Sequence, residues 1–205
     1  MAGELDRAMG RLKHRDIRTR RRAVRTLVEL EDPESLKAFK SLLNDEDSWF
    51  VSKALDAYRR WAPTVGLDAV QDLTAHSSLN VRRCGANLLD ALGENGTSIA
   101  KVMLDDEDSV VRRKAADALL THGDNKAIEA MHQNANDAIR SLAMRHRSCS
   151  KEQLLNGLKD ASASVQIEAL RALLNRDEAV ELSAIQPFFG LQSGTVKLFL
   201  WMAKH

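Results

Sequence analysis

Residues 105–120 read "DDEDSVVRRKAADALL", in which four acidic residues precede a basic triplet and an apolar run. The beginning of this stretch, "LDDEDS" at 104–109, has a near copy in "LNDEDS" at 43–48. A phrase used twice within 205 residues indicates internal repeats. Alignment on the pair Val111-Arg112 gives equivalent pairs every 26 to 31 residues, at Thr19-Arg20, Phe50-Val51, Val81-Arg82, Ile139-Arg140, Val165-Gln166 and Val196-Lys197.

The aligned units share a helical pattern. Three residues after each pair stands a small residue, in six of the seven units: Ala23, Ala54, Gly85, Ala115, Ala143 and Ala169. Four residues further on, five units have a large apolar residue, namely Leu27, Tyr58, Leu89, Leu119 and Leu173, whereas Arg147 and the last unit depart from the pattern. Apolar residues at this spacing predict one buried face of an α-helix in each unit.

The start of each predicted helix is also periodic. Four residues before the second member of each pair stand residues that commonly cap helix N-termini: Asp16, Asp47, Ser78, Asp108, Asn136, Ser162 and Ser193. The acidic run at 105–108 is therefore interpreted as a capped helix start, where negative charge is favourable. It lacks the glycine and the alternating ligands of a calcium loop, which argues against an ion site.

A second, earlier helix is predicted in each unit. "EDPESLKAFKSLLN" (31–44) begins with Asp32 and Pro33, and "SKEQLLNGLKD" (150–160) begins with the capping-box pair Ser150 and Gln153. "GTSIAKVML" (96–104) and "DNKAIEAMHQ" (124–133) fill the same place in other units. No strand-like alternation is present. We predict one domain over 1–205, made of seven helix pairs with approximate bounds 1–31, 32–62, 63–93, 94–123, 124–148, 149–176 and 177–205.

This pattern resembles the HEAT repeat, and most closely the HEAT-like repeats of phycobilisome-lyase-type proteins. "DSVVRRKAADALL" (108–120) and "LNVRRCGANLLDALG" (79–93) carry the resemblance best, whereas "DSWFVSKALDAY" (47–58) and the last unit match poorly. The resemblance implies an all-α, right-handed solenoid of about seven antiparallel helix pairs. It leaves the function open, because this scaffold is found in adaptors, chaperones, bilin lyases, a di-iron hydroxylase and DNA glycosylases.

The composition argues against several classes of function. A net charge of +1 gives no global attraction to nucleic acid or membranes, and no apolar stretch is long enough to span a bilayer. Two cysteines, Cys84 and Cys149, are too few for a disulfide framework and are expected to be buried thiols in a reducing, cytoplasmic compartment. The six histidines form no metal-binding pair, so neither a metal nor a cofactor is predicted. Catalysis is the less favoured class.

Charge is unevenly distributed between the two helices of each unit. The segments around the second helices (16–30, 47–61, 78–92, 108–120, 136–147, 162–175 and 193–205) carry a net +10, so the remaining residues carry −9. The arginines of the aligned pairs recur, which favours a structural role on neighbouring turns. The residues one and five positions after the second member of each aligned pair are expected to face outward. The candidate partner-binding residues are Arg21, Arg25, Arg59, Arg83, Arg113, Arg145, Arg171, Ile167, Leu198 and Met202.

The outward positions become apolar toward the C-terminus, at Ile167, Leu198 and Met202. An exposed apolar surface commonly marks a contact site, so weak self-association through the last unit is expected. Pro187 lies within the predicted first helix of that unit and should kink or end it. The competing interpretation is that Pro187 turns these side chains inward.

We therefore predict a scaffold that binds an acidic or acidic-amphipathic protein segment on the second-helix face. A nucleic-acid binder, including a relative of DNA glycosylases, is the alternative, and a bilin-lyase-like accessory protein is another. A glycosylase would need an acid with aromatic walls. Trp49, Phe50, Tyr58 and Trp61 do surround Asp56 in the sequence, but Phe50 and Tyr58 occupy buried positions of the repeat, which favours core packing.

Overall fold

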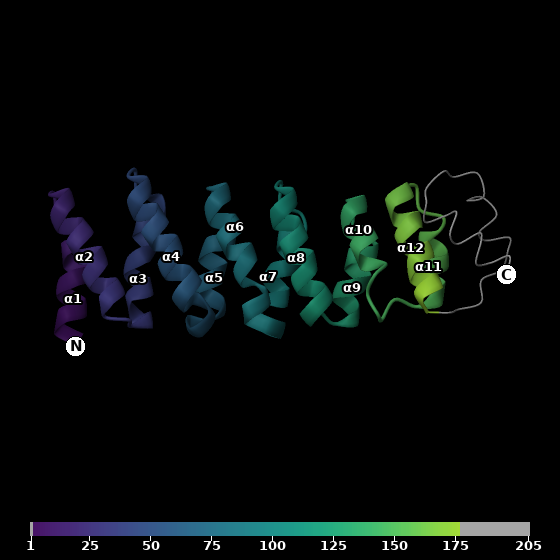
Figure 1. Ribbon diagram of the computed structural model, residues 1–205, viewed down its shortest axis with the longest axis horizontal. Coiled ribbons are helices and arrows are strands. Elements are labelled where there is room, and N and C mark those ends of the chain that lie inside the picture. Colours follow the sequence, from purple (N-terminus) through teal and green to yellow (C-terminus); the bar gives the residue numbers. More distant parts are fainter. Residues whose placement is uncertain (1, 177–205) are drawn as a thin grey trace. The chain divides into compact units, whose positions relative to one another are not determined.

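The computed structural model describes residues 2–176, and these residues are helical with short connections and no strand (Figure 1). The chain divides into two compact units, residues 1–118 and 119–205, with the boundary inside one helix. The α-helices of the first unit are α1 (Ala2–Arg11), α2 (Ile17–Glu29), α3 (Leu36–Phe39), α4 (Ser48–Val65), α5 (Leu67–Thr74), α6 (Leu79–Leu88), α7 (Thr97–Met103) and most of α8 (Ser109–His122). Those that follow are α9 (Asn125–His132), α10 (Asp137–Ala143), α11 (Lys151–Gly157) and α12 (Ala163–Asn175).

Three short 3-10 helices complete the described secondary structure: η1 (Pro33–Ser35), η2 (Lys40–Asn44) and η3 (Asp90–Gly96). The predicted first helix at 31–44 is thus a short α-helix, α3, between two 3-10 segments. Its predicted apolar face is nevertheless correct, because Leu36, Phe39, Leu42 and Leu43 are all buried. Asp32 caps η1 as expected, accepting a bond from the Glu34 amide.

Consecutive helices form pairs: α1 contacts α2, α3 contacts α4, and α5 contacts α6 (Figure 1). In the first unit the second helices α2, α4 and α6 contact one another in sequence, and the first helices α5 and α7 also contact. In the second unit α9 contacts α10, α11 contacts α12, and the second helices α10 and α12 pack together. The all-helical repeat fold is thereby confirmed for residues 2–176. The predicted unit bounds and the seventh unit stay predictions, since residues 177–205 lie outside the described part.

The predicted core register is confirmed by burial. At the first position of the aligned pairs, Phe50, Val81, Val111, Ile139 and Val165 are buried. At the large apolar position, Leu27, Tyr58, Leu89, Leu119 and Leu173 are buried as well, whereas Arg147 is exposed. Burial also accounts for the aromatic group: Phe50, Tyr58 and Trp61 are core residues, and burial raises the pKa of Tyr58 to about 12.

The small position of the repeat has a steric cause. A Cβ atom added at Gly85 would lie 2.8 Å from Thr74 Cγ2 and 2.9 Å from Leu73 Cβ, so α5 and α6 approach too closely for a larger residue. The backbone requires a glycine at another place: α4 is followed by Gly66, whose φ of 101° lies in the left-handed region that favours glycine. Cys84 and Cys149 are free and buried as expected, and burial raises the pKa of Cys149 to about 11.

His132, the last residue of α9, is expected to make the stability of the protein depend on pH. Both of its ring nitrogens are buried and have no hydrogen-bond partner. Burial lowers the pKa of His132 below its usual 6.5, Glu129 opposes this shift, and the nearby His146 adds to it. The unfolded chain therefore binds a proton first as the pH falls through about 6.5, so the folded state loses stability.

We expect the urea midpoint of the protein to fall between pH 7.5 and pH 5.5, because protonation of His132 favours the unfolded chain. The His132→Leu variant should show a smaller fall and should be at least as stable at pH 7.5, since it removes two unpaired buried nitrogens. Some dependence should persist, because burial also lowers the pKa of His146. An equal fall in both proteins would contradict this role.

Candidate partner-binding surface

The turns between the first and second helices share one hydrogen-bonded arrangement. Two residues before each N-cap, a side chain accepts the backbone N–H of the cap residue, at distances of 2.8–3.0 Å. The accepting residues are His14, Asp45, His76, Asp106, Asn134 and Asp160. This position recurs in the sequence at the same spacing as the caps, two residues before each of them.

The predicted caps are confirmed at four of the six described positions. The side chains of Asp16, Asp47, Asp108 and Asn136 accept amides of the first helical turn. Ser78 and Ser162 occupy the cap position but make no such bond; Ser162 instead donates to Asp137. Ser193 lies outside the described residues. The capping box of Ser150 and Gln153 is also present.

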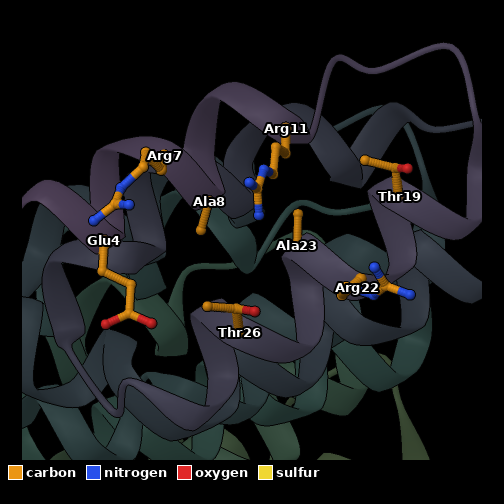
Figure 2. A pocket seen from close by; sticks show the side chains of 8 residues that line it. All are labelled: Glu4, Arg7, Ala8, Arg11, Thr19, Arg22, Ala23 and Thr26. Carbon is orange, nitrogen blue, oxygen red and sulfur yellow. The ribbon is translucent and has the colours of Figure 1, made fainter.

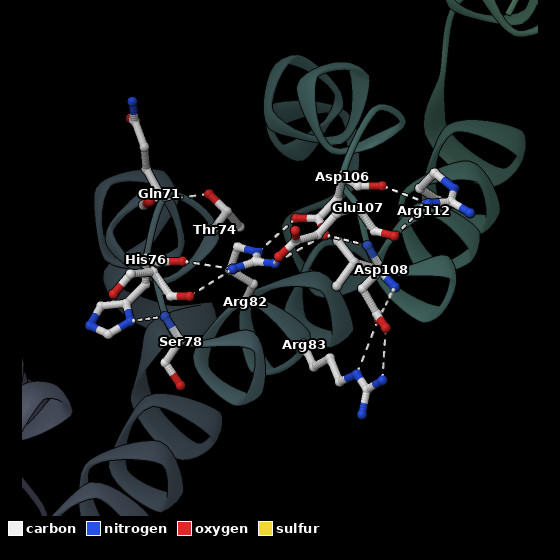
Figure 3. A network of polar contacts seen from close by, with 12 residues as sticks. Gln71, Thr74, His76, Ser78, Arg82, Arg83, Asp106, Glu107, Asp108 and Arg112 are labelled. Carbon is white, nitrogen blue, oxygen red and sulfur yellow. Dashed lines mark hydrogen bonds and ion pairs between the residues drawn. The ribbon is translucent and has the colours of Figure 1, made fainter. Parts of the chain in front are cut away.

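The recurring arginines form hydrogen bonds both to these turns and to an acidic residue of the next repeat, as Figure 3 shows for Arg82. Its Nε donates to Asp106 at 2.8 Å, and its Nη1 donates to the carbonyls of His76 and Ser77 at 3.2 and 2.9 Å. Arg140 repeats the arrangement on the carbonyls of Asn134 and Ala135, with Asp160 as its acid. The predicted structural role of the paired arginines is confirmed.

The acidic run at 105–108 belongs to the same turn. Asp106 accepts from Arg82 and from the amide of Asp108, while Asp108 accepts from Arg83 at 2.8 and 3.0 Å (Figure 3). The hydrogen bond from Arg83 is the main cause that lowers the pKa of Asp108 to about 2. Among residues 2–176 no group of three or more His, Cys, Asp or Glu side chains is placed to hold a metal ion.

Three of the predicted partner-binding arginines in the first unit form ion pairs within that unit. Arg21 binds Asp47 at 2.9 Å and Arg83 binds Asp108 at 2.8 Å, in each case the N-cap of the next second helix. Arg59 binds Asp56 at 3.0 Å on its own helix. Their charges are partly neutralised, and Arg21 also lies 5.2 Å from the centre of the Trp49 ring.

Arg25 and Arg113 are exposed and form no ion pair within the described part of the chain. They stand on α2 and α8, at the outward positions that the helical pattern predicted. These two side chains are the cations of the first unit's predicted surface that remain available to an external anion.

The second unit brings two predicted residues together. Arg145, two residues beyond the end of α10, and Arg171 on α12 both donate to Glu168, at 3.0 and 2.6 Å. The Glu168 side chain is 11% exposed, whereas the side chains of Arg145 and Arg171 are 53% and 46% exposed. The buried carboxylate thus fixes two guanidinium groups while leaving part of each open to solvent. The sequence pattern predicts that the helix continues through Arg145, but α10 ends at Ala143.

A cavity of about 420 Å³ adjoins this pair, and we call it the arginine pocket. Its lining consists of Arg145, Arg147, Glu168, Arg171, Ala172, Asn175 and Arg176. Arg176 donates to the backbone carbonyls of His146 and Cys149, which holds it in place. Sequence reasoning missed Glu168, Arg147 and Arg176; the departure of Arg147 from the apolar pattern was the available signal.

Of the three apolar residues predicted to contact a partner, Ile167 lies in the described part of the chain. Ile167 is half-buried on α12. Leu198 and Met202 lie outside the described residues, as does Pro187. The proposed self-association therefore stays a prediction.

No described helix combines the length and the apolar character that crossing a membrane requires.

Comparisons with known proteins find a similarity to HEAT repeats in part of the chain. Residues 5–83 match a family model described as HEAT repeats. A search of curated protein sequences finds no match. Among solved structures, an Escherichia coli protein, YibA, has a TM-score of 0.49 and 12% identity, with 98% of this chain and 92% of that chain covered.

Two further structures are similar in part. The complex of CpcE and CpcF of phycocyanin lyase from Nostoc sp. has a TM-score of 0.37 and 16% identity, covering 97% of this chain and 83% of that one. A designed armadillo repeat protein in complex with the peptide (KR)4 has a TM-score of 0.37 and 16% identity, covering 97% of both chains. With these identities and TM-scores, the structures identify neither a ligand nor an activity.

Proposed function

We propose that this chain, whose residues 5–83 match a family model of HEAT repeats, is a binding scaffold for an acidic segment of a partner protein. The segment binds to the second helices of the repeats. The observation that carries the proposal is the arginine pocket, whose lining contains four arginines and a single carboxylate that is already bound to two of them.

The chemistry of the pocket suits carboxylates. A guanidinium group presents several N–H donors in one plane and can bind a carboxylate through two of them. Glu168 accepts from Nε of Arg145, and the Arg145 side chain is 53% exposed, so its guanidinium group can also bind a ligand from solvent. Because Glu168 already holds these side chains, a partner loses less side-chain entropy in ordering them.

Matched variants test this proposal. We expect the double variant Arg145→Gln/Arg171→Gln to bind a fluorescent poly-glutamate peptide about 2-fold to 30-fold more weakly than the unaltered protein, measured by anisotropy. Two exposed ion pairs of about 0.2–1 kcal/mol each give this range. Lys159→Gln changes an exposed cation that lies outside the pocket and should leave affinity unchanged. Equal affinity of all three proteins would contradict the proposal.

The basic excess of the second helices also supports nucleic acid as the alternative partner. If this face follows phosphates, affinity for DNA or RNA should fall steeply with salt, and neutralising Arg21, Arg25, Arg83 and Arg113 should reduce that slope. We expect weak binding, since Arg21 and Arg83 are already paired with aspartates. Submicromolar binding at physiological salt, lost in the quadruple variant, would favour the alternative.

A further inference from the structure

A second basic site lies between α1 and α2, at a cavity of about 400 Å³ that we call the N-terminal groove (Figure 2). One wall consists of Glu4, Arg7, Ala8 and Arg11 of α1, and the other of Thr19, Arg22, Ala23 and Thr26 of α2. Each set has the spacing i, i+3, i+4, i+7, which is the spacing of one helix face. The groove is thus made of two parallel ridges of side chains, one from each helix.

The floor of the groove is made of small residues. Ala8 and Ala23 are each only 2% exposed, and they stand at the middle of their respective walls. Figure 2 shows Arg11 extending toward the space between these two alanines, with Arg7 and Arg22 on opposite sides. Small side chains at the floor allow a third helix to approach α1 and α2 closely. The axes of packed helices lie about 8–10 Å apart, and the side chains at the contact set this distance.

The charges of the groove are not balanced by its own residues. Arg7, Arg11 and Arg22 are exposed, and Glu4 is the one acid that lines the cavity. Nε of Arg7 donates to the carbonyl of Gly3 at 2.7 Å, and no ion pair engages Arg11 or Arg22 in the described part of the chain. Arg7 and Arg11 stand four residues apart on one helix, where like charges destabilise by a few tenths of a kcal/mol.

The excess positive charge extends over the whole first helix pair. Residues 1–30 contain nine arginines and lysines but four aspartates and glutamates. An anionic ligand in the groove would relieve this repulsion, whereas a neutral or cationic one would not. The spread of the three arginines over both walls suits several separate charges better than one compact anion.

We propose that the N-terminal groove binds an acidic α-helix of a partner protein. Glutamates four residues apart on that helix would face Arg7 and Arg11, a third would face Arg22, and a small residue would lie over Ala8 and Ala23. The groove shares no residue with the arginine pocket, so the inference goes beyond the proposed function and can fail independently of it.

The test uses the full-length protein and an alanine-based, fluorescein-labelled helical peptide of about 17 residues with its glutamates on one face. A second peptide has the same composition with the glutamates distributed around the helix. We expect the first peptide to bind more tightly, in a salt-dependent manner, and to slow hydrogen exchange of α1 and α2 amides. The variant Arg11→Ala/Arg22→Ala should weaken binding about 2-fold to 30-fold, the range of two exposed ion pairs.

The control variant is Arg15→Ala/Arg18→Ala, which removes two exposed arginines of the same region that do not line the groove. It should bind the peptide as the unaltered protein does, and circular dichroism should show both variants helical. Arg145→Gln/Arg171→Gln should retain the exchange protection of α1 and α2. The proposal is overturned if neither peptide binds, if both double variants lose affinity equally, or if a 16-nucleotide single strand binds more tightly with the same dependence on Arg11 and Arg22.

Discussion

Replacing Leu173 with alanine is expected to lower the free energy of unfolding by about 2–5 kcal/mol, the range seen for fully buried leucines. Leu173 stands on α12 with no exposed surface, in a cluster that also contains Leu154, Val165 and Leu170. Truncation removes apolar contacts and leaves a cavity that the surrounding helices fill only in part. Urea denaturation followed by circular dichroism measures the change.

The adjacent residue provides the control for this prediction. Leu174 is partly buried against the edge of the same cluster, so Leu174→Ala should cost less than half as much. Both variants carry the same chemical change on the same helix, and they differ in burial alone. Equal costs, or a cost below about 0.5 kcal/mol for Leu173→Ala, would mean that the repeat register is wrong.

The second large effect is expected at Arg140, whose replacement by alanine should cost about 1.5–3 kcal/mol, as for hydrogen bonds to charged groups. The guanidinium group binds Asp160 through two nitrogens at 2.8 and 2.9 Å and two turn carbonyls at 2.8 and 2.9 Å. Its side chain is 18% exposed and that of Asp160 is 15% exposed. Loss of the arginine leaves these acceptors poorly satisfied.

Arg140→Lys separates geometry from charge. Lysine keeps the positive charge but cannot reproduce the planar set of donors, so it should recover only part of the loss. A double-mutant cycle with Asp160→Asn should give a coupling free energy above about 0.5 kcal/mol, since the residues are in direct contact. Full recovery by lysine would show that charge alone matters. In Arg140→Ala, the pKa of Asp160, which Arg140 lowers, should rise toward its usual value.

Arginines that recur at one repeat position have structural roles, whereas arginines that break the repeat pattern can line a binding site. Arg82 and Arg140, which recur at one repeat position, are engaged by turn carbonyls and by the acid of the next turn. Side chains that break the repeat, such as Arg147, line the arginine pocket. The repeat positions that hold the turns together must stay the same from repeat to repeat. Other surface positions can vary, and binding differs between repeat proteins at those positions.

The sequence by itself determined the helical repeat and its buried face. Val81, Ala115 and Leu119 could be assigned to the core because apolar residues at helical spacing lie on one face of the helix, and that face is buried. The N-caps at Asp16 and Asp47 were equally predictable, since capping is a local interaction within four residues. Both kinds of prediction depend on neighbours in the chain alone.

The tertiary structure decided which charged residues form ion pairs with one another and where the helices end. The pairs Arg21–Asp47 and Arg83–Asp108 join residues 26 and 25 positions apart, and the rise of a single helix cannot specify such contacts. The end of α10 at Ala143 placed Arg145 beside Arg171, on a carboxylate that appeared in the sequence as one more helical glutamate, Glu168. Packing of one repeat against the next fixes these partners, because burial of Glu168 is favourable only where two cations compensate it.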